Sequence, residues 1–415
     1  AGERFAFSQW GCGTFTGVRT HLSERFVCTP EGLLNEGDIL RYEHGVHNAF
    51  SLLTVDKKAL CAIEYHGIAS RLKEMALGNN PRGTIGTGVG QAYRNSIRWP
   101  IYSIRAEELS SVGLKDKVAA IREKIHEDLE PIINGGKFLP EDKEQTEQEI
   151  ALLKSDKFLN YVVGRLQECS KRVKIVDSEY FAWEILTKDN SVIVESSHGV
   201  LTDSYYGFYP HVSALRTLPV FAQDMVQSTG YTGQIFNVGV TRAYAVRHGA
   251  GPMPTDSPSM AQQLLPGSHK PDNRYQGKVR VGPLDFVMLK YALEVCGGPL
   301  SFDALAVTWF DQIQSNGLWS VCKRYNSGTD DKRFFGPDGA IKVCRFADGS
   351  KQQKYQERLT KQLQDCEPEV ITYPVFRTAS RDKMFQLCDG VISDELGVPV
   401  RMVGFGPTEL DKVCK

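Results

Sequence analysis

Apolar residues follow two kinds of pattern along this chain: short continuous runs and longer stretches with helical spacing. Continuous runs bounded by small or charged residues predict strands, whereas apolar residues three and four positions apart predict helices. The predicted strands are one that begins at Arg4 and ends before Gly11, 52–55, 192–194 and 304–308, and the predicted helices are 59–75, 114–133 and 143–173. Because Asn134, Gly135, Gly136 and Pro140 break the helical pattern, 106–175 is expected to form a helical subdomain with short connections.

The stretch 192–217 carries the densest set of features that a plain core does not need. It is predicted to open as a buried strand, Val192–Val194, that delivers His198 and Gly199 to a turn. In open α/β sheets, ligands bind just beyond the carboxyl ends of strands. Gly207 to Pro210 forms a second tight turn, in which the proline fixes the backbone. This stretch is therefore a candidate ligand loop.

Two further loops are rich in glycine. Gly11, Gly13 and Gly17 follow the first predicted strand, and RGTIGTGVGQAY occupies 82–93. Backbone amides freed by glycines can form an anion-binding concavity, and Thr84 adds a hydroxyl to the second loop. A structural or flexible turn is the alternative for both loops.

Composition and charge narrow the class of protein. The chain has 415 residues, 41% hydrophobic and 24% charged, which suits one large α/β domain or two smaller ones. A formal net charge of −1 gives no general attraction to nucleic acid or to an anionic membrane. No apolar run approaches a membrane span and no secretory signal is apparent, so neither is expected. The ten scattered cysteines favour free thiols and a cytoplasmic location.

Several of these stretches resemble the adenylosuccinate synthetase family. Glu195, Gly199, Asp203, Gly207, Tyr209 and Pro210 match the family's Glu-Gly-Ala-Gln-Gly, Leu-x-Asp and Gly-Thr-Tyr-Pro segments. The most specific match is NVGVTRAYAVRHGAGPMPTD at 237–256. Gln9-Trp10-Gly11, 41–49, 82–93, 304–311 and 400–407 also match, in the family's order, whereas 273–285 departs from the family and keeps only Arg280, Gly282 and Asp285. The chain is thus identified as a divergent member of that family.

The resemblance implies a fold and a chemistry. The implied fold is α/β, with a large central, mostly parallel sheet flanked by helices, like that of P-loop ligases, and a helical insertion. The family phosphorylates the 6-oxygen of IMP with GTP and then displaces that phosphate with aspartate, with Mg²⁺ as cofactor. It also implies a homodimer whose active site borrows an arginine from the partner subunit.

The catalytic positions are where this chain departs most. Cys12 stands where the family has its catalytic aspartate, and Phe15 where it has the first lysine of the phosphate loop. Ser51 stands where the family has its catalytic histidine. A cysteine can act as a base only as a thiolate. Alternatively, a smaller residue at this position can admit a bulkier purine, since viral members of the family that use dGMP lack the loop aspartate. His198 maps onto the family glutamine at the purine and remains either a ligand or an ordinary loop histidine.

The resemblance also implies residues for each substrate. The nucleotide set is Asn48, Ala49, Thr84, Arg98, His198 and Ser213, with Arg98 as the arginine that crosses to the partner subunit. The aspartate set is Gln276, Lys278 and Arg280, because Gly277 and Val279 replace two family arginines and Arg274 or Lys278 must compensate. Two missing arginines put aspartate itself in doubt as the amine.

The donor nucleotide is expected at the ends of two strands. The donor set is Thr308, Trp309, Asp311, Gly404, Phe405 and Gly406. In the family an aspartate at the Asp311 position reads guanine, while Trp309 replaces a lysine and can stack on a purine. Asp311 as a simple helix cap is the alternative.

Three hypotheses follow from the sequence. The first is an active ligase that joins IMP, or a related purine nucleotide such as dGMP, to aspartate or another amine with GTP or ATP. The second is a catalytically impaired paralogue that binds purine nucleotides as a sensor or partner protein. The third is an unrelated α/β nucleotide-binding enzyme.

Overall fold

The computed structural model describes residues 5–186, 191–265 and 275–415. These residues form two compact units, 1–193 and 194–415, each of which is treated by itself. Helices and strands alternate in both, and most strand pairs are parallel, so the predicted α/β class with mostly parallel strands is confirmed. The strands are shared among several small sheets, two to four strands each.

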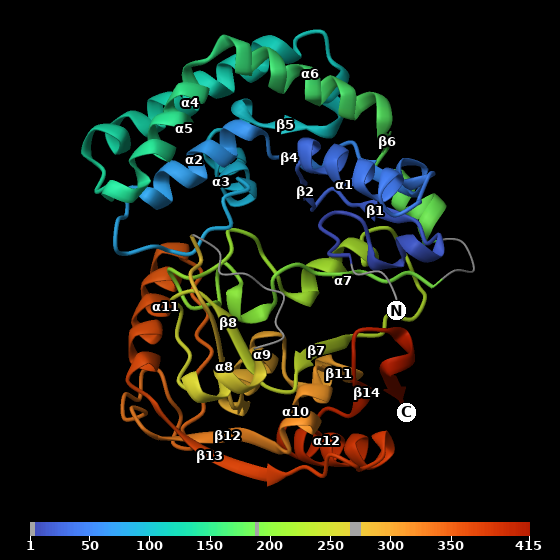
Figure 1. Cartoon of the computed structure of the whole chain (residues 1–415), viewed down its shortest axis with the longest axis vertical. Helices are drawn as coiled ribbons and strands as arrows, with labels where there is room; N and C mark the ends of the chain where they lie inside the picture. The colour runs from blue at the N-terminus through green and yellow to red at the C-terminus, as the bar shows by residue number, and fades with distance from the viewer. Residues whose placement is uncertain (1–4, 187–190, 266–274) are drawn as a thin grey trace. The chain divides into compact units, whose positions relative to one another are not determined.

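The first unit combines two small sheets with a group of helices (Figure 1). Its helices are α1 Pro30–Tyr42, α2 Glu64–Met75, α3 Val89–Arg98, α4 Leu114–Gly135, α5 Lys143–Lys154 and α6 Asp156–Arg172. Its strands are β1 Thr20–Leu22, β2 Val27–Cys28, β3 Leu53–Asp56, β4 Leu60–Cys61, β5 Ile104–Arg105 and β6 Lys174–Val176. Strands β1, β3 and β6 form a parallel sheet, and β4 lies between β2 and β5.

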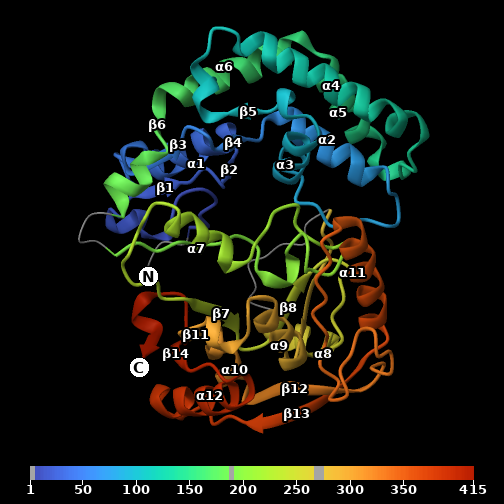
Figure 2. The ribbon, with the colours of Figure 1, turned by 180° about the vertical axis from the view of Figure 1, so that it is seen from behind.

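The second unit is built on a four-stranded sheet in the order β15-β14-β11-β7, with β11 paired in parallel to both β7 and β14 (Figure 2). Its helices are α7 Pro219–Gln227, α8 Pro258–Leu264, α9 Phe286–Val295, α10 Phe310–Asn316, α11 Gly349–Gln364 and α12 Arg381–Leu396. Its strands are β7 Val238–Arg242, β8 Ala245–His248, β9 Val279–Gly282, β10 Leu284–Asp285, β11 Ala304–Thr308, β12 Leu318–Ser327, β13 Glu367–Pro374, β14 Val400–Gly404 and β15 Lys412–Cys414.

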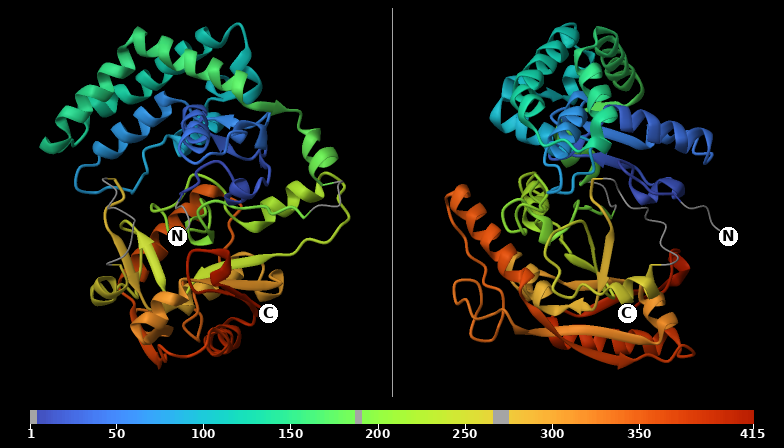
Figure 3. Two further views of the ribbon diagram at one scale, coloured as in Figure 1. Left: turned by 45° about the vertical axis from the view of Figure 1, so that its right-hand side comes forward. Right: turned by 60° about the vertical axis from the view of Figure 1, so that its left-hand side comes forward.

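The core of the second unit buries the strand β11, which explains why this strand is apolar. Trp319 on β12 is fully buried, and its indole packs edge-on against Phe310. The Trp319 indole N–H donates a 2.6 Å hydrogen bond to the Ala243 carbonyl, which satisfies the one polar group of this side chain. Figure 3 shows the long orange pair β12 and β13 near the red helix α12, which packs on β14. The strand ends that carry the predicted donor site are therefore fixed by a dense core.

Two predicted strands are absent. Residues 5–10 form no strand, because the amide groups of Ser8 and Gln9 donate to the buried Glu36 carboxylate, each at 2.8 Å, instead of to a neighbouring strand. The predicted buried strand Val192–Val194 is also wrong: these residues are 38%, 87% and 44% exposed and form no strand. They lie where the first unit gives way to the second along the chain. An apolar run alone thus misplaced them.

The helical predictions hold with shifted ends. The predicted helix 59–75 begins at Glu64, because Leu60 and Cys61 form the short strand β4. The predicted helix 143–173 is two helices, and the Ser155 side chain between them accepts a hydrogen bond from the Phe158 amide. Among the helices of the described residues, none is long and apolar enough to span a bilayer. All ten cysteines are free thiols, as predicted.

His66 provides a test of the first unit through its pH dependence. Burial lowers the pKa of His66 from its usual value of 6.5 to about 4, and its Nδ1 accepts a 3.1 Å hydrogen bond from the Ile63 amide. Between these pH values the unfolded chain binds a proton that the folded chain does not, so this histidine lowers stability as pH falls. We expect His66→Gln, which keeps an acceptor at this position, to remove about 2–3 kcal/mol of the stability loss between pH 7 and pH 4.5.

The measurement is urea denaturation of both proteins at the two pH values, followed by circular dichroism. Other titrating groups are common to both proteins, so they cancel in the difference. An identical loss of stability in the wild type and in His66→Gln would contradict the assignment of a neutral, buried imidazole.

Candidate functional site

Gln9 and Trp10 are held by bonds to other parts of the first unit. The Gln9 side-chain amide donates to the Thr29 carbonyl at 3.1 Å and accepts from the Thr29 amide at 2.8 Å. The Trp10 indole donates to the Ala49 carbonyl at 3.1 Å. The predicted catalytic stretches around Cys12 and Ser51 are therefore brought near one another by this indole.

The chemical groups at the two predicted catalytic positions differ in availability. Cys12 is exposed at the start of a 3₁₀ helix, Cys12–Thr16. The Ser51 hydroxyl donates a 2.7 Å hydrogen bond to the Asn48 carbonyl, and the Ala49 side chain is fully buried. The Ser51 hydroxyl proton is thus already donated within its own turn.

The loop 82–93 is held by a carboxylate of its own unit. The buried Glu74 of α2 accepts hydrogen bonds from the Gly83 amide at 2.6 Å and the Thr84 amide at 3.4 Å. The Thr84 hydroxyl lies 2.9 Å from the Ser70 hydroxyl and accepts from the Gly86 amide at 3.2 Å. Two of the glycine amides expected to receive a ligand anion are therefore already bonded, that of Gly83 to Glu74 and that of Gly86 to the Thr84 hydroxyl. Sequence reasoning missed Glu74, because nothing in its local pattern marks a helical glutamate as a loop partner.

Arg98 lies at the end of α3 with its side chain 68% exposed. Its guanidinium is 3.4 Å from the Asp128 carboxylate of α4 and 4.5 Å from the centre of the Trp99 ring. Both contacts are near solvent and contribute little, about 0–1 kcal/mol for such an ion pair. The guanidinium can leave them at low cost.

In the second unit, Asp203 is the centre of the turn that follows His198. Its fully buried carboxylate accepts from the amides of Tyr205, Tyr206 and Thr217 at 2.8–3.1 Å, so this residue holds the turn together. His198 is exposed and has a left-handed backbone with φ of 68°. An exposed non-glycine residue in this region is strained, which is frequent at functional loops.

Ser213 contributes to the same turn through its backbone and side chain. Its amide donates to the Thr202 carbonyl at 2.8 Å, and its hydroxyl oxygen accepts from the Leu215 amide at 3.1 Å. Within residues 5–186, 191–265 and 275–415 this hydroxyl donates to no acceptor, so it can donate to a ligand oxygen.

The predicted aspartate set falls on and beside β9. Arg280 is a cross-strand neighbour of Arg247 on β8. The Arg280 guanidinium donates to the Gly249 carbonyl at 2.6 and 3.0 Å and also to the Gly251 carbonyl, so it holds the glycine loop. Lys278 is exposed and Gln276 is half-buried, whereas Arg274 lies outside the described residues.

Arg247, which the sequence reading treated only as a family match, is the more confined arginine. It donates to the His211 carbonyl at 3.2 Å, and its buried Nε has no hydrogen-bond partner among the described residues. Burial and the neighbouring Arg280 charge lower the pKa of Arg247 to about 10. A Cβ added at Gly251 would lie 1.7 Å from the Arg247 Nη2, so a larger residue there would displace this guanidinium.

The donor set is brought together at the carboxyl edge of the β14-β11-β7 sheet. Thr308 ends β11 beside Arg242 on β7, and Gly404 ends the neighbouring β14. Trp309 follows with a left-handed backbone, φ of 64°, and begins α10. The Phe405 side chain packs against Phe310, while the Gly406 carbonyl accepts from the Lys412 ammonium at 2.5 Å.

Arg242, Trp309 and Tyr244 form a cluster at this edge, in which the Tyr244 and Trp309 rings are tilted by 53°. The Arg242 guanidinium lies 4.9 Å from the Trp309 ring, and the Tyr244 ring lies 5.7 Å from it. Burial lowers the pKa of Arg242. The Asp311 carboxylate accepts a 2.7 Å bond from its neighbour Gln312, and the helix cap position belongs to Trp309 instead. Arg242 could have been found from the sequence, since it ends the strand next to Thr308.

Magnesium, which the family implies, was tested against the side chains present. No group of three histidine, cysteine, aspartate or glutamate side chains lies close enough to hold a metal ion in the described parts of the chain. Magnesium in nucleotide enzymes is held largely by substrate phosphates and water. No residue here is therefore assigned to the metal.

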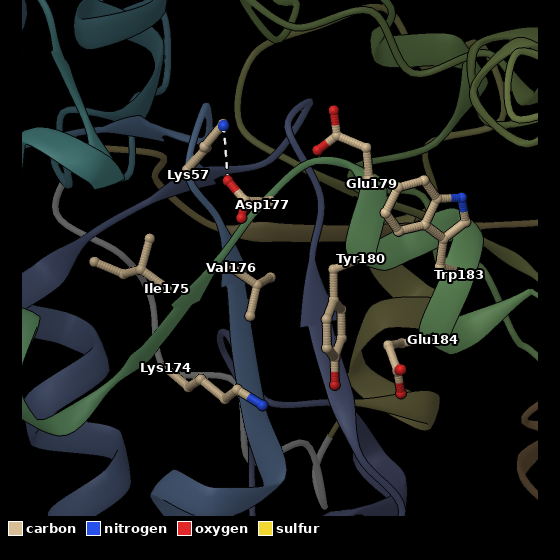
Figure 4. Close-up of a pocket in the computed structure, with 9 residues that line it drawn as sticks. All are labelled: Lys57, Lys174, Ile175, Val176, Asp177, Glu179, Tyr180, Trp183 and Glu184. Atoms are coloured by element: carbon tan, nitrogen blue, oxygen red, sulfur yellow. Dashed lines mark hydrogen bonds and ion pairs between the residues drawn. The ribbon is translucent and has the colours of Figure 1, made fainter.

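A pocket of about 520 Å³ lies elsewhere in the first unit, beside β6. Figure 4 shows Lys57 paired with Asp177 at 2.7 Å, and Tyr180 and Trp183 nearby. The Lys174 ammonium is 5.3 Å from the Tyr180 ring. None of the residues predicted to contact a substrate is among the residues that line this pocket.

Comparison with known proteins places these features in one family. The chain is 29% identical to adenylosuccinate synthetase from Clostridium novyi over 308 residues, covering 73% of this chain and 66% of that protein. It is 24% identical to adenylosuccinate synthetase from Cytophaga hutchinsonii over 418 residues, covering 100% of this chain and 88% of the relative. The chain thus spans about two thirds of the length of the Clostridium novyi relative.

A solved structure, the fully ligated adenylosuccinate synthetase from Plasmodium falciparum, shares the fold with a TM-score of 0.67 and 19% identity, over 96% of this chain and 85% of that chain. The family model for adenylosuccinate synthetase matches residues 1–413. Since that match takes in all but the last two residues, the chain belongs to the adenylosuccinate synthetase family, a family of C–N ligases.

Proposed function

We propose that this chain is a purine nucleotide ligase of the adenylosuccinate synthetase type. It joins IMP, or a related purine nucleotide such as dGMP, to L-aspartate or another amine, with hydrolysis of GTP or ATP. The observation that carries the proposal is the strand edge where Asp311, Trp309 and Gly404–Gly406 meet, within a chain that matches the family throughout.

The proposed reaction has two steps that balance. A base removes the N1 proton of the purine, the 6-oxygen attacks the γ-phosphorus, and the bond to the leaving nucleoside diphosphate breaks. The amine nitrogen then attacks C6, loses a proton, and phosphate leaves with the 6-oxygen. Cys12 occupies the base position, and as a thiolate it can accept the N1 proton.

Guanine is the donor base that this site suits best. Guanine presents adjacent N1–H and N2–H donors to a carboxylate, whereas adenine presents an acceptor at N1. Asp311, whose carboxylate accepts a hydrogen bond from the neighbouring Gln312, supplies that carboxylate. Trp309, which contacts Arg242 and Tyr244, has an indole ring on which a purine can stack. We therefore favour GTP over ATP as phosphoryl donor.

The amine acceptor site has fewer guanidinium groups than the family pattern. Arg280 is used on the Gly249 and Gly251 carbonyls, and the exposed Lys278 is the cation of the predicted set that can meet a substrate carboxylate. This set of side chains can bind at least one substrate carboxylate. An amine with one carboxylate is thus a reasonable competitor to aspartate.

The remaining expectations concern assembly and conditions. Mg²⁺ is proposed to arrive on the phosphates of the donor, where it neutralises their charge. We also propose a homodimer in which Arg98 reaches the partner's nucleotide, since its Asp128 and Trp99 contacts are weak. The ten free thiols support a cytoplasmic location.

One observation favours a second function, that of a nucleotide-binding protein without catalysis. The family's catalytic histidine is replaced by Ser51, whose proton is used on the Asn48 carbonyl. A serine hydroxyl so engaged supplies little acid strength to the phosphoryl step. The binding loops remain, which is what a sensor needs.

Phosphate release separates these two functions. IMP, GMP and dGMP are to be crossed with GTP and ATP in the presence of aspartate and Mg²⁺, and the purine product weighed by mass spectrometry. We expect release together with a succinylated purine for one nucleotide with GTP. Reactions without aspartate are the control. Nucleotide binding without release from any pair would overturn the ligase and support the sensor.

Asp311→Asn tests the choice of donor. An amide in place of the carboxylate removes a charge-assisted contact to guanine, so we expect the KM for GTP to rise about 30–100-fold, equivalent to about 2–3 kcal/mol. The weaker use of ATP should change less than threefold. Asp394→Asn, the same substitution at an exposed position on α12, is the matched control. Equal losses for GTP and ATP would show that Asp311 does not read the base.

A further inference from the structure

One face of α2 holds the loop 82–93 over the part that precedes α3, residues 82–88. Ser70 and Glu74 contact the start of the loop, and Gly67, one turn earlier, meets its end. Gly88 has a φ of 85°, and a side chain added there would lie 2.4 Å from the Gly67 amide nitrogen. Gly88 is therefore required by a backbone-to-backbone approach, whereas a Cβ at Gly67 would lie 2.9 Å from the Arg71 Nη1. The loop follows the surface of the helix rather than hanging free.

Arg71 supplies the contact at the middle of this face. Its Nη1 donates a 2.9 Å hydrogen bond to the Gly86 carbonyl. The other side of the same guanidinium, Nε and Nη2, forms a forked pair with the Glu149 carboxylate of α5, the Nη2 contact being 2.8 Å. A planar guanidinium cannot move one edge without moving the other. Glu149 therefore fixes the orientation in which Arg71 meets the loop.

The Arg71–Glu149 ion pair is poorly exposed, so its loss is expected to have a large effect. The side chain of Glu149 is 8% exposed and that of Arg71 is 27% exposed. Removing one member of a poorly exposed ion pair leaves the other charge without compensation, so the remaining side chain turns toward water. If Arg71 turns away, the Gly86 carbonyl loses its donor. The centre of the loop would then be free to move between its fixed ends.

We propose that Glu149, on α5, is a positioning residue for nucleotide binding by the loop 82–93. It acts through Arg71, which transmits its orientation to Gly86. The inference rests on the proposed function in one respect, namely that this loop receives a purine nucleotide. The arrangement keeps the loop in a single shape before the nucleotide arrives, which lowers the entropy lost on binding.

The test uses the full chain and the substitution Glu149→Gln, which keeps the volume and removes the charge. Hydrogen–deuterium exchange of the peptide 82–93 and the Kd values for IMP, GMP and dGMP are to be measured. We expect the loop amides to exchange at least 10-fold faster and the best nucleotide to bind about 10-fold more weakly. Glu149→Asp, which retains the charge, should recover part of both. The KM should rise while kcat changes less than twofold.

Two further variants guard the interpretation. Glu127→Gln removes a surface partner of Lys124 on α4 and should leave exchange and affinity unchanged. If Glu149→Gln does not fold, Arg71→Lys replaces it, because a lysine cannot bond both Glu149 and Gly86 in the same fork. The same loosening of the loop is expected from that variant.

Loop exchange that does not change in Glu149→Gln or Arg71→Lys would overturn the proposal. Faster exchange without any change in nucleotide affinity would also overturn it, because Glu149 would then hold the loop for a reason other than binding. A wild-type chain that binds none of the three nucleotides would instead contradict the proposed function. The exchange measurement would still decide whether Glu149 controls the loop.

Discussion

Buried carboxylates that accept hydrogen bonds from loop amides are the interaction on which both units depend. Glu36 receives the amides of residues 8–10, Glu74 receives those of Gly83 and Thr84, and Asp203 receives three amides of its turn. A carboxylate without partners is costly to bury, and so is an amide. Each contact removes both costs at once. Burial raises the pKa of Glu36, while its three amide bonds act in the opposite direction.

These carboxylates also show what a sequence can and cannot reveal. The apolar strand 304–308 was predicted correctly, because an unbroken buried run between polar residues leaves few alternatives. The run Val192–Val194 has the same character yet is exposed, since it joins the two units in sequence instead of entering a sheet. The strand expected from Arg4 failed for another reason. The amides of residues 8–10 donate hydrogen bonds to Glu36, which lies 26–28 residues away in the sequence. A local sequence pattern cannot predict so distant a partner.

The same distinction between local patterns and distant partners applies to the residues of the candidate site. Glycine spacing and strand ends located the loop 82–93 and the meeting of Thr308 with Gly404, because these depend on local backbone geometry. The hydrogen-bond partners of the arginines could not be predicted from the sequence. Arg280 was expected to face a substrate and is used on two backbone carbonyls, whereas the confined guanidinium is that of Arg247. A residue's type gives its chemistry, but only the fold says on what that chemistry is used.

The left-handed backbone of Trp309 has an optical consequence. Its indole, at the turn into α10, contacts the Arg242 guanidinium and the Tyr244 phenol ring. Trp319, by contrast, is sealed in the core with its indole N–H bonded to a carbonyl. A base that stacks on Trp309 changes the surroundings of this chromophore and leaves Trp319 in the same environment. The emission spectrum of the chain therefore contains a built-in reporter of occupancy at the edge of β11.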